Sequence, residues 1–335
     1  MAAGARGRVG EFGLIARYFR PLASDPGTFA LTDDAARFRP KAGEELVVTT
    51  DLLAEGVHFL AEDAAASIAR KALRVNLSDL AAKGADPAGY LLAIALPKDW
   101  TEDWVRKFAN GLKGDQDTYG IALLGGDTSR AAGGLTIVIT AIGHLPKGRM
   151  VRRKGARPGD LVFVSGTVGD AALGLRLRLG SIDGAPAGKG AKHLLDRYLH
   201  PQPRTRLAPV LRRFATSALD VSDGLVGDLG HICEESGVAA TIEAAAVPLS
   251  RPATALVATD PSALVTVLTG GDDYEILSTV PPRSADAYAA AATAAGVPVT
   301  RIGTVTRGKA PPRVVGADGK DLELASQSWD HFGKG

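Results

Sequence analysis

The stretch AASIARKALRVNLSDLAAKGADPAGYLLAIAL, residues 65–96, passes from helical to extended spacing and so decides the class of fold. Apolar residues recur every three or four positions through 65–83, which predicts an amphipathic helix, and Gly84 is a suitable residue to end it. A continuous apolar run follows at 90–96 and stops at Pro97, which is typical of a buried strand. A helix followed directly by a strand indicates an α/β arrangement.

The same alternation continues on both sides of this stretch. The predicted elements are strands at 46–50, 121–124 and 135–142 and helices at 11–20 and 101–119. The first of these strands would deliver Asp51 at its end. The pattern predicts one α/β domain in the first part of the chain.

The turn Arg157-Pro158-Gly159-Asp160 marks a candidate boundary, and we expect two domains, residues 1–148 and 149–335. The second part repeats the alternation. Its predicted elements are strands at 161–165, 264–268 and 275–280, a strand–turn–helix at 218–236, and helices near 191–199, 205–215 and 284–295.

Composition excludes several classes of function. The chain has 335 residues, 45% of them apolar and 23% charged, with a formal net charge of +2, which is too close to neutral for a nucleic-acid binder. A single cysteine, Cys233, excludes an intrachain disulfide and a cysteine-based metal site. No apolar run reaches the length of a membrane span, and residues 1–10 lead into no signal-peptide core. We therefore expect a cytoplasmic protein.

Short acidic clusters in apolar or glycine-rich surroundings are the main chemical signal. They are Asp33-Asp34, Thr49-Thr50-Asp51, Asn76-Leu77-Ser78-Asp79, Gly125-Gly126-Asp127-Thr128 and Asp220-Val221-Ser222-Asp223. Carboxylates with hydroxyls and backbone carbonyls are hard ligands that suit Mg²⁺ or Mn²⁺ and do not suit zinc or iron. Such a set indicates an enzyme that handles phosphates through metal ions.

Each cluster also has a structural interpretation. Taken alone, Asp51 is better explained by a turn or a helix cap, and Asp223 can serve as an N-cap as well as a ligand. Gly125-Gly126-Asp127 is either a tight turn or a backbone nest for an anion. Asn76 and Asp79 share one helix face, where a buried carboxylate needs a partner, either a neighbouring loop or a metal.

The segment Gly270–Glu275 follows a predicted strand and adds further acids that suit a cation or a basic substrate group. Neither a Walker A motif nor a kinase catalytic loop is present, so a nucleotide would be held through metal-bridged phosphates. The basic run 149–154 is either a solvated face or a phosphate contact. His58 and Trp329 are each explained by a structural role as well as by a substrate contact.

Taken in order, these motifs resemble the bacterial thiamine-monophosphate kinases. The matching segments are Gly10–Ile15, Thr50-Asp51 with Gly56–Phe59, Lys71–Pro87, Leu124–Thr128, Asp220–Leu225 with Asp228–Ile232, Gly270–Glu275 and Trp329–Phe332. The family belongs to the aminoimidazole-ribonucleotide-synthetase-like (PurM-like) superfamily. The resemblance implies an α/β (α+β) fold of two domains, with an N-terminal mixed sheet that forms a barrel at a dimer interface and a C-terminal α+β domain.

The resemblance also implies the reaction. It is ATP-dependent phosphorylation of thiamine monophosphate to thiamine diphosphate by direct Mg²⁺-assisted transfer, the last step in making thiamine diphosphate. The N-terminal domain would bind metal and ATP and form a homodimer, and the C-terminal domain would complete the substrate and nucleotide sites. No partner of nucleic-acid or membrane type is implied.

Residue roles follow from the matched motifs alone. Several Mg²⁺ ions would be held by Asp34, Thr49, Thr50, Asp51, Asp79, Asp127, Asp220 and Asp223. ATP would contact Gly126, Asp127, Arg153 and Ser222, and thiamine monophosphate would contact His58, Asp272 and Trp329. No catalytic base is assigned, because the attacking phosphate oxygen is already an anion.

Two positions depart from the family pattern. Thr32 stands where the family has a glycine before its paired acids, and Asp272 stands where it has a glutamate. Two rival functions therefore stay open. One is a sibling ATP-dependent enzyme acting on another substrate, although Cys233 lies at neither terminus where siblings carry a reactive cysteine. The other is a nucleotide-sensing homologue without catalysis.

Overall fold

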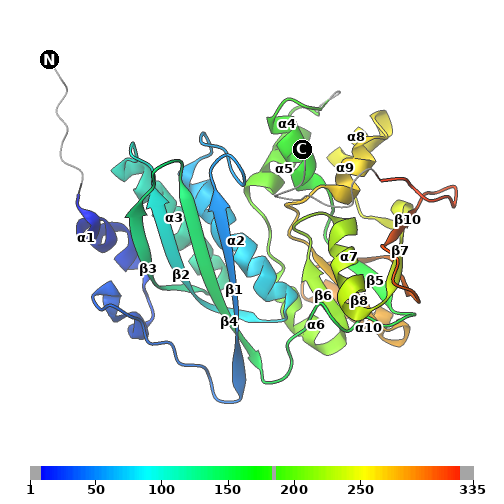
Figure 1. The fold of residues 1–335 in the computed structure, drawn as a ribbon, viewed down its shortest axis with the longest axis horizontal. Helices are drawn as coiled ribbons and strands as arrows, with labels where there is room; N and C mark the ends of the chain where they lie inside the picture. The colour runs from blue at the N-terminus through cyan, green and yellow to red at the C-terminus, as the bar shows by residue number, and fades with distance from the viewer. Residues whose placement is uncertain (1–8, 183–185, 325–335) are drawn as a thin grey trace. The chain divides into compact units, whose positions relative to one another are not determined.

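The computed structural model describes residues 9–182 and 186–324 (Figure 1). The chain divides into two compact units. Unit 1 comprises residues 1–80 and 86–147, and unit 2 comprises residues 81–85 and 148–335. Each unit has its own sheet and its own apolar core, and each is described by itself below.

Unit 1 is a four-stranded mixed sheet in the order β1-β4-β2-β3. Its elements are α1 (Glu11–Leu14), β1 (Glu44–Ala54), α2 (Ala65–Ala82), β2 (Asp86–Leu96), α3 (Glu102–Tyr119), β3 (Ala122–Arg130) and β4 (Thr136–Pro146). β1 and β2 both pair antiparallel with β4, and β2 runs parallel to β3. Helix α2 connects β1 to β2, and α3 makes the crossover from β2 to β3, as parallel pairing requires.

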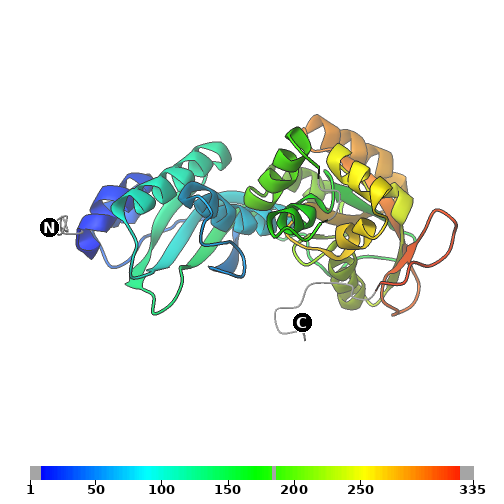
Figure 2. The ribbon, with the colours of Figure 1, turned by 90° about the horizontal axis from the view of Figure 1, so that it is seen from above.

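The two long helices lie on the same side of this sheet (Figure 2). Side chains of β4 alternate accordingly: Ile137, Ile139 and Ala141 are almost fully buried, whereas the positions between them are only partly buried. On β1 the same alternation leaves Val48 and Leu52 exposed on the opposite face. One face of the sheet is therefore covered by helices, and the other is open within this unit.

Two strands are longer than the sequence predicted, and this moves two acidic motifs. β1 continues to Ala54, so Asp51 lies inside the strand and not at its end. β3 continues to Arg130, so Gly125-Gly126-Asp127 is part of a strand and not a turn after one. Pairing to β4 and β2 along the whole length extends both strands beyond their apolar runs. The predicted helices at 65–83 and 101–119 are confirmed, with Gly84 in the left-handed conformation after α2.

The N-terminal segment is helical where a helix was predicted. α1 continues into a π-helical turn (Ile15–Phe19) and a 3₁₀ turn (Arg20–Leu22), and a second 3₁₀ segment covers Pro26–Leu31. Along this segment Phe19 is buried, whereas Phe12 is 85% exposed. Three consecutive residues of the last segment, Phe29 to Leu31, have positive φ angles.

Unit 2 is built on a six-stranded sheet in the order β10-β7-β9-β5-β8-β6. Its strands are β5 (Leu161–Ser165), β6 (Ser217–Asp220), β7 (Ala239–Glu243), β8 (Ile276–Val280), β9 (Val299–Thr306) and β10 (Arg313–Val315). Its helices are α4 (Asp170–Arg178), α5 (Lys189–Leu199), α6 (Ala208–Phe214), α7 (Leu225–Ser236), α8 (Arg251–Thr259), α9 (Ala263–Thr269) and α10 (Ala285–Ala294).

Apolar side chains of unit 2 pack on both faces of its sheet. On β5, Val162 and Val164 belong to one buried cluster with residues of α7, α8 and α9. Phe163, which lies between them, belongs to a second cluster with residues of α6 and α10. Adjacent residues of a strand point to opposite faces, so both faces of this sheet are buried. Strands β5 and β8 are accordingly buried along almost their whole length, and they confirm the strands predicted at 161–165 and 275–280.

The strand predicted at 264–268 is wrong. These residues form helix α9, and Gly270-Gly271-Asp272 follows a helix instead of a strand. The β-branched residues Val265, Thr266 and Val267 favour a strand by propensity. Burial of Ala263, Val267 and Leu268 against the core has helical spacing, and this packing outweighs the local preference.

Within the described part of the chain, no helix combines the length and the apolar character needed to cross a membrane.

Helix α3 carries two glycines with opposite surroundings, which gives a test of the packing. A β-carbon at Gly111 would lie 2.6 Å from the carbonyl oxygen of Ala66 on α2, whereas Gly114 has only an Arg70 side-chain atom within 4 Å. We expect Gly111→Ala to destabilise the protein by about 1–3 kcal/mol through overpacking. Gly114→Ala should stabilise it by about 0.5–1 kcal/mol through helix propensity. Chemical denaturation measures both, and equal effects would contradict this close helix contact.

Candidate functional site

Thr49, Asp51 and Asp79 form a cluster between β1 and α2 in unit 1. The hydroxyl of Thr49 donates a hydrogen bond of 2.5 Å to Oδ2 of Asp79. Burial raises the pKa of Asp51 to about 7, and the negative charge of Asp79 contributes in the same direction. The sequence placed these residues in two separate motifs, and the structure brings them together on the helix-covered face of the sheet.

Thr50 lies on the other side of the strand. Its hydroxyl donates to the carbonyl oxygen of Ile139 at 3.2 Å and lies 3.0 Å from the hydroxyl of Thr140 on β4. Neighbouring residues of a strand point to opposite faces, so the sheet separates Thr50 from Thr49 and Asp51. Its role as a metal ligand stays a prediction.

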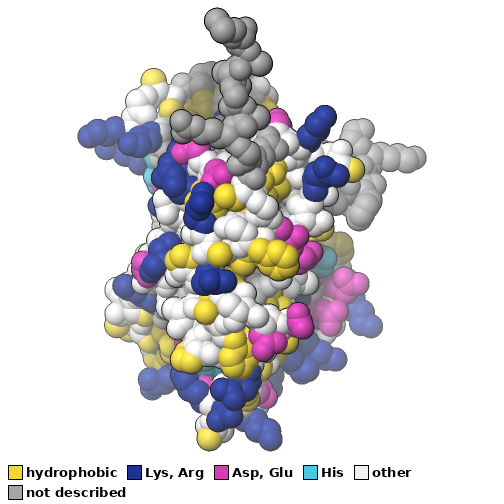
Figure 3. All heavy atoms as spheres, turned by 90° about the vertical axis from the view of Figure 1, so that its left-hand side faces the viewer, with side chains coloured by type: hydrophobic (Ala, Val, Ile, Leu, Met, Phe, Trp, Pro, Cys, Tyr) yellow, Lys and Arg dark blue, Asp and Glu magenta, His cyan; other side chains and the backbone are white. Residues whose placement is uncertain are grey.

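A cavity of about 740 Å³ lies on the open face of the unit 1 sheet. It is walled by the N-terminal segment and by strands β2, β3 and β4, and it brings together Asp33, Asp34, Gly126 and Asp127. Its other lining is largely apolar and includes Phe12, Ile15, Phe19, Leu31, Phe38, Leu91 and Val138. Figure 3 shows hydrophobic side chains gathered across the face of the molecule that carries α1 and β3, with acidic and basic side chains beside them. A cavity with apolar walls and three carboxylates suits a ligand with a flat apolar part and a metal-bound anionic part.

Gly126 is required by the close approach of two strands. A β-carbon at this position would overlap the carbonyl oxygen of Leu92 on β2. The pairing of β2 with β3 shifts its register between Tyr90 and Leu91, next to this point. The glycine therefore lets β3 pass the irregularity and places the exposed side chain of Asp127 beside the cavity.

His58 lies in the loop after β1, where its ring accepts a hydrogen bond. The backbone N–H of Ala54 donates to Nδ1 at 3.1 Å, so the neutral ring carries its proton on Nε2. The ammonium group of Lys71, a side chain only 2% exposed, donates to the carbonyl oxygen of His58 at 2.9 Å. No role was predicted for Lys71, although a lysine within the apolar stretch 65–83 indicates a charge that needs a buried partner.

In unit 2, Asp220 is the last residue of β6, and the turn from β6 to α7 carries Ser222 and Asp223. The backbone of this turn is held by Asp228, whose Oδ2 accepts hydrogen bonds from the N–H groups of Ser222 and Asp223, each at 3.0 Å. Burial raises the pKa of Asp228 to about 7, and these two donors offset that effect only in part. Arg153 also acts on this carboxyl through its positive charge. Asp228, to which no role was predicted, thus holds the predicted metal ligand Asp223 and the predicted ATP contact Ser222, and it feels the charge of Arg153.

The segment Gly270–Glu275 lies directly against this turn. The N–H groups of Asp272 and Tyr274 donate to the carbonyl oxygens of Ser222 and Val221 at 2.9 and 2.8 Å. A β-carbon at Gly271 would overlap the carbonyl oxygen of Ser222, so only glycine allows this approach. Asp272 and Tyr274 both have left-handed backbone conformations, which residues with a side chain rarely adopt. The tyrosine hydroxyl donates to Asp272 at 3.3 Å.

The donor atoms of unit 1 fit a hard cation. Among the residues that the structure describes, no three His, Cys, Asp or Glu side chains converge closely enough to hold a metal ion. Asp51 and Asp79 nevertheless repel each other while partly buried, which is the situation that a bound cation relieves. Carboxylate and hydroxyl oxygens are the ligands that Mg²⁺ prefers. Trp329, predicted to contact substrate, lies outside the described residues.

Comparisons with known proteins agree over both units. The sequence profile of the AIR synthase related protein N-terminal domain matches residues 32–145, and that of the C-terminal domain matches residues 157–315. The chain is 42% identical to the thiamine-monophosphate kinase of Caulobacter vibrioides, over 96% of this chain and 90% of that protein. Solved structures are similar as well, among them the following two. The thiamine-monophosphate kinase of Stenotrophomonas maltophilia K279a has 43% identity and a TM-score of 0.82, covering 94% of this chain and 98% of that one. AaThiL complexed with AMPPCP and TMP has 32% identity and a TM-score of 0.77, covering 98% and 100%.

The raised pKa of Asp51 predicts how stability depends on pH. The folded state keeps the carboxyl of Asp51 protonated up to about pH 7, whereas the unfolded state keeps it protonated only up to about pH 4. As pH rises from about 4 to about 7, this carboxyl becomes a buried carboxylate in the folded state, and the fold loses stability. We expect Asp51→Asn to gain about 1–3 kcal/mol relative to the wild type between about pH 5 and about pH 8, which is roughly 3–9 °C in Tm. Thermal unfolding at both pH values measures the difference.

Added Mg²⁺ provides the control for this prediction. It should raise the Tm of the wild type more at the higher pH, where Asp51 is ionised, and should raise that of Asp51→Asn much less. A pH-independent gap between the two proteins would show that Asp51 is not the titrating group.

Proposed function

Given that the chain belongs to the AIR synthase related family, and within it to the thiamine-monophosphate kinases, we propose that it transfers the γ-phosphoryl group of ATP to thiamine monophosphate and so forms thiamine diphosphate. The observation that carries the proposal is the Thr49–Asp51–Asp79 cluster, in which two carboxylates repel each other at a position suited to a cation. The similar structure that holds an ATP analogue and TMP supports both substrates.

The chemistry requires two anionic groups to meet. The terminal phosphate oxygen of thiamine monophosphate is already a nucleophile, so no side chain has to remove a proton. The obstacle is repulsion between the phosphates of the two substrates. Mg²⁺ bound at these carboxylates would neutralise that charge and orient the reacting groups. We propose Asp51 and Asp79 as holders of one ion on the helix-covered face, with Thr49 fixing the rotamer of Asp79 through its hydrogen bond. We propose Asp127 as the holder of a further ion at the cavity on the open face.

The remaining predicted ligands divide between the two units. Asp34, Gly126 and Asp127 share the cavity of unit 1, whose apolar walls suit the base of ATP. In unit 2, Asp220 ends β6, and Ser222 and Asp223 follow it on the turn beside Arg153, which suits metal-bridged phosphate. For thiamine monophosphate we propose His58 and Asp272, the latter a carboxylate that complements the positive charge of the thiazolium ring.

We propose in addition that the protein is a homodimer formed through the open face of the unit 1 sheet. Val48 and Leu52 are 60% and 54% exposed there, and Leu46 and Leu91 are 39% and 40% exposed. Cross-strand pairing of Val48 with Ile142 and of Leu52 with Val138 places these side chains on the face that floors the cavity. A second copy would remove this apolar surface from water, in keeping with the barrel interface that the family resemblance implies.

Turnover is the direct test of the reaction. Wild-type protein, thiamine monophosphate, ATP and Mg²⁺ should give thiamine diphosphate and ADP in equal amounts, and omission of Mg²⁺ should abolish both. Asp127→Asn should lower kcat roughly 10²-fold or more, the scale of losing one electrostatic contact in an active site. Asp117→Asn, at an exposed acid paired with Lys113 on α3, is the matched control and should leave kcat unchanged.

The products decide between the alternatives. ADP without thiamine diphosphate would indicate a sibling enzyme with another acceptor, and binding of ATP without ADP formation would indicate a nucleotide sensor.

The dimer has a separate test. We expect Val48→Lys to shift the protein from dimer to monomer, because a charge at the centre of an apolar interface has no partner. Leu179→Lys is the matched control, since Leu179 is 59% exposed in unit 2. Analytical ultracentrifugation at micromolar concentration measures the mass. A wild-type monomer, or equal masses for both variants, would contradict this interface.

A further inference from the structure

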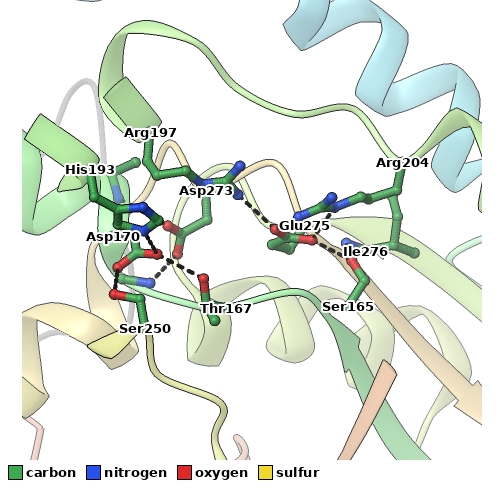
Figure 4. Close-up of polar contacts among 12 residues, drawn as sticks. Ser165, Thr167, Asp170, His193, Arg197, Arg204, Ser250, Asp273, Glu275 and Ile276 are labelled. Atoms are coloured by element: carbon green, nitrogen blue, oxygen red, sulfur yellow. Dashed lines mark hydrogen bonds and ion pairs between the residues drawn. The ribbon is translucent and has the colours of Figure 1, made fainter. Parts of the chain in front are cut away.

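A buried ion cluster in unit 2 holds the last acidic segment of the chain (Figure 4). Glu275 is fully buried, and its carboxylate is bound by Arg197 from α5 and by Arg204 from the segment before α6. Nε of Arg204 donates to Oε2 at 2.7 Å and its Nη2 donates to Oε1, while Nη2 of Arg197 donates to Oε1 at 2.7 Å. The hydroxyl of Ser165, at the end of β5, adds a fourth hydrogen bond at 2.6 Å.

A second buried acid lies two residues earlier. Asp273 is 3% exposed and accepts hydrogen bonds from the N–H groups of Gly169 and Ala171 at the start of α4, at 2.6 and 3.2 Å. In Figure 4, Asp273 and Glu275 point toward different groups of donors. The segment is thus anchored at two alternate residues, each by partners more than 70 positions away in the sequence.

In this segment, the residues with unfavourable backbone conformations are Tyr274, which lies between the anchors, and Asp272, which directly precedes the first anchor. Asp272 has φ of 70° and Tyr274 has φ of 52°. Such angles persist only where the surroundings determine them more strongly than local preference does. Here the surroundings are the two anchored carboxylates on one side and the 220–224 turn on the other.

The same segment fixes the neighbouring turn through the backbone. Besides the two bonds that Asp272 and Tyr274 donate, the N–H of Val221 donates to the carbonyl oxygen of Glu275 at 2.8 Å. Three backbone hydrogen bonds, one of them at Glu275 itself, therefore connect the 272–275 segment to the turn after Asp220 that carries Ser222 and Asp223. A change in the position of Glu275 would be transmitted to both acid-bearing segments.

From this arrangement we propose that the Arg197–Glu275–Arg204 ion cluster is a positioning device for the reaction, with Arg204 as a positioning residue that sets the geometry of Asp272 and of the 220–224 turn. The kinetic part of the proposal rests on the proposed function. The structural part stands on the hydrogen bonds alone.

Arg204→Lys is the informative variant. It keeps the positive charge beside Glu275 but removes the two parallel hydrogen bonds that only a guanidinium forms. Glu275→Gln would leave two buried arginines without their carboxylate and risks failure to fold. The side chain of Arg204 is 18% exposed, so a lysine there retains access to water.

Unit 1 offers a matched control in Arg74. This residue binds Asp115 through the same two atoms, Nε and Nη2, at 2.7 and 2.8 Å, and its side chain is 15% exposed. Arg74→Lys therefore removes an equivalent pair of hydrogen bonds between α2 and α3, at a place that touches neither acid-bearing segment of unit 2. A purely structural role for Arg204 would make the two variants alike.

The experiment combines kinetics with backbone hydrogen exchange on the full-length wild type and both variants. We expect the two variants to lose similar amounts of Tm. Only Arg204→Lys should have a KM for thiamine monophosphate at least fivefold higher than that of the wild type. In that variant, kcat should fall by a smaller factor than KM rises. Exchange should be faster in peptides covering 219–224 and 270–276 of Arg204→Lys and unchanged there in Arg74→Lys.

Each result bears on the proposal. Equal KM values in the two variants, or unchanged exchange in Arg204→Lys, would overturn the positioning role. If the wild type itself makes no thiamine diphosphate, the proposed function fails, and the exchange measurement still decides whether Arg204 holds the two segments.

Discussion

A carboxylate that leaves water needs hydrogen-bond donors or a cation in its place, and this constraint organises both units of the protein. In unit 2, Asp273 and Glu275 are almost fully buried and are supplied with backbone N–H groups, arginines and a serine hydroxyl. In unit 1, Asp51 and Asp79 share a partly buried position in which the nearest donor shown is the hydroxyl of Thr49. The first arrangement builds a rigid scaffold, and the second leaves negative charge for a ligand to neutralise.

This difference separates structural acids from functional ones within a single chain. Asp170, for example, is fully buried but is bound by Thr167, His193 and Ser250, so it joins α4, α5 and the start of α8. Asp228 stands between the two kinds, since it shapes the 220–224 turn through two N–H groups while its own burial raises its pKa. Acids that accept many hydrogen bonds hold neighbouring segments in place. Acids with few hydrogen-bond donors around them suit the metal-bound phosphates of a phosphoryl transfer.

The unit 1 sheet uses its two faces for different purposes. The period of two along β1 sends Thr49 and Asp51 toward α2, and sends Val48, Thr50 and Leu52 to the open face. The open face also floors the cavity that contains Asp34 and Asp127. A dimer through this face would cover the cavity with the same contact that buries the apolar side chains. Assembly and ligand binding would then depend on one surface.

Local sequence patterns were enough to predict the alternation of helices and strands around residues 65–96, the motifs that carry the acids, and through them the family. These are local properties, because apolar periodicity and short motifs are read within a dozen residues. Only the tertiary structure decided that residues 264–268 are helical, that Asp51 lies within a strand beside Asp79, and that Glu275 is held by Arg197 and Arg204. The helical state of residues 264–268 depends on the burial of one helix face. The other two findings depend on packing or on charge partners that lie 28 or more positions away, as Asp79 does from Asp51. No local preference encodes such contacts, since they are stabilised only when the whole unit has formed around them.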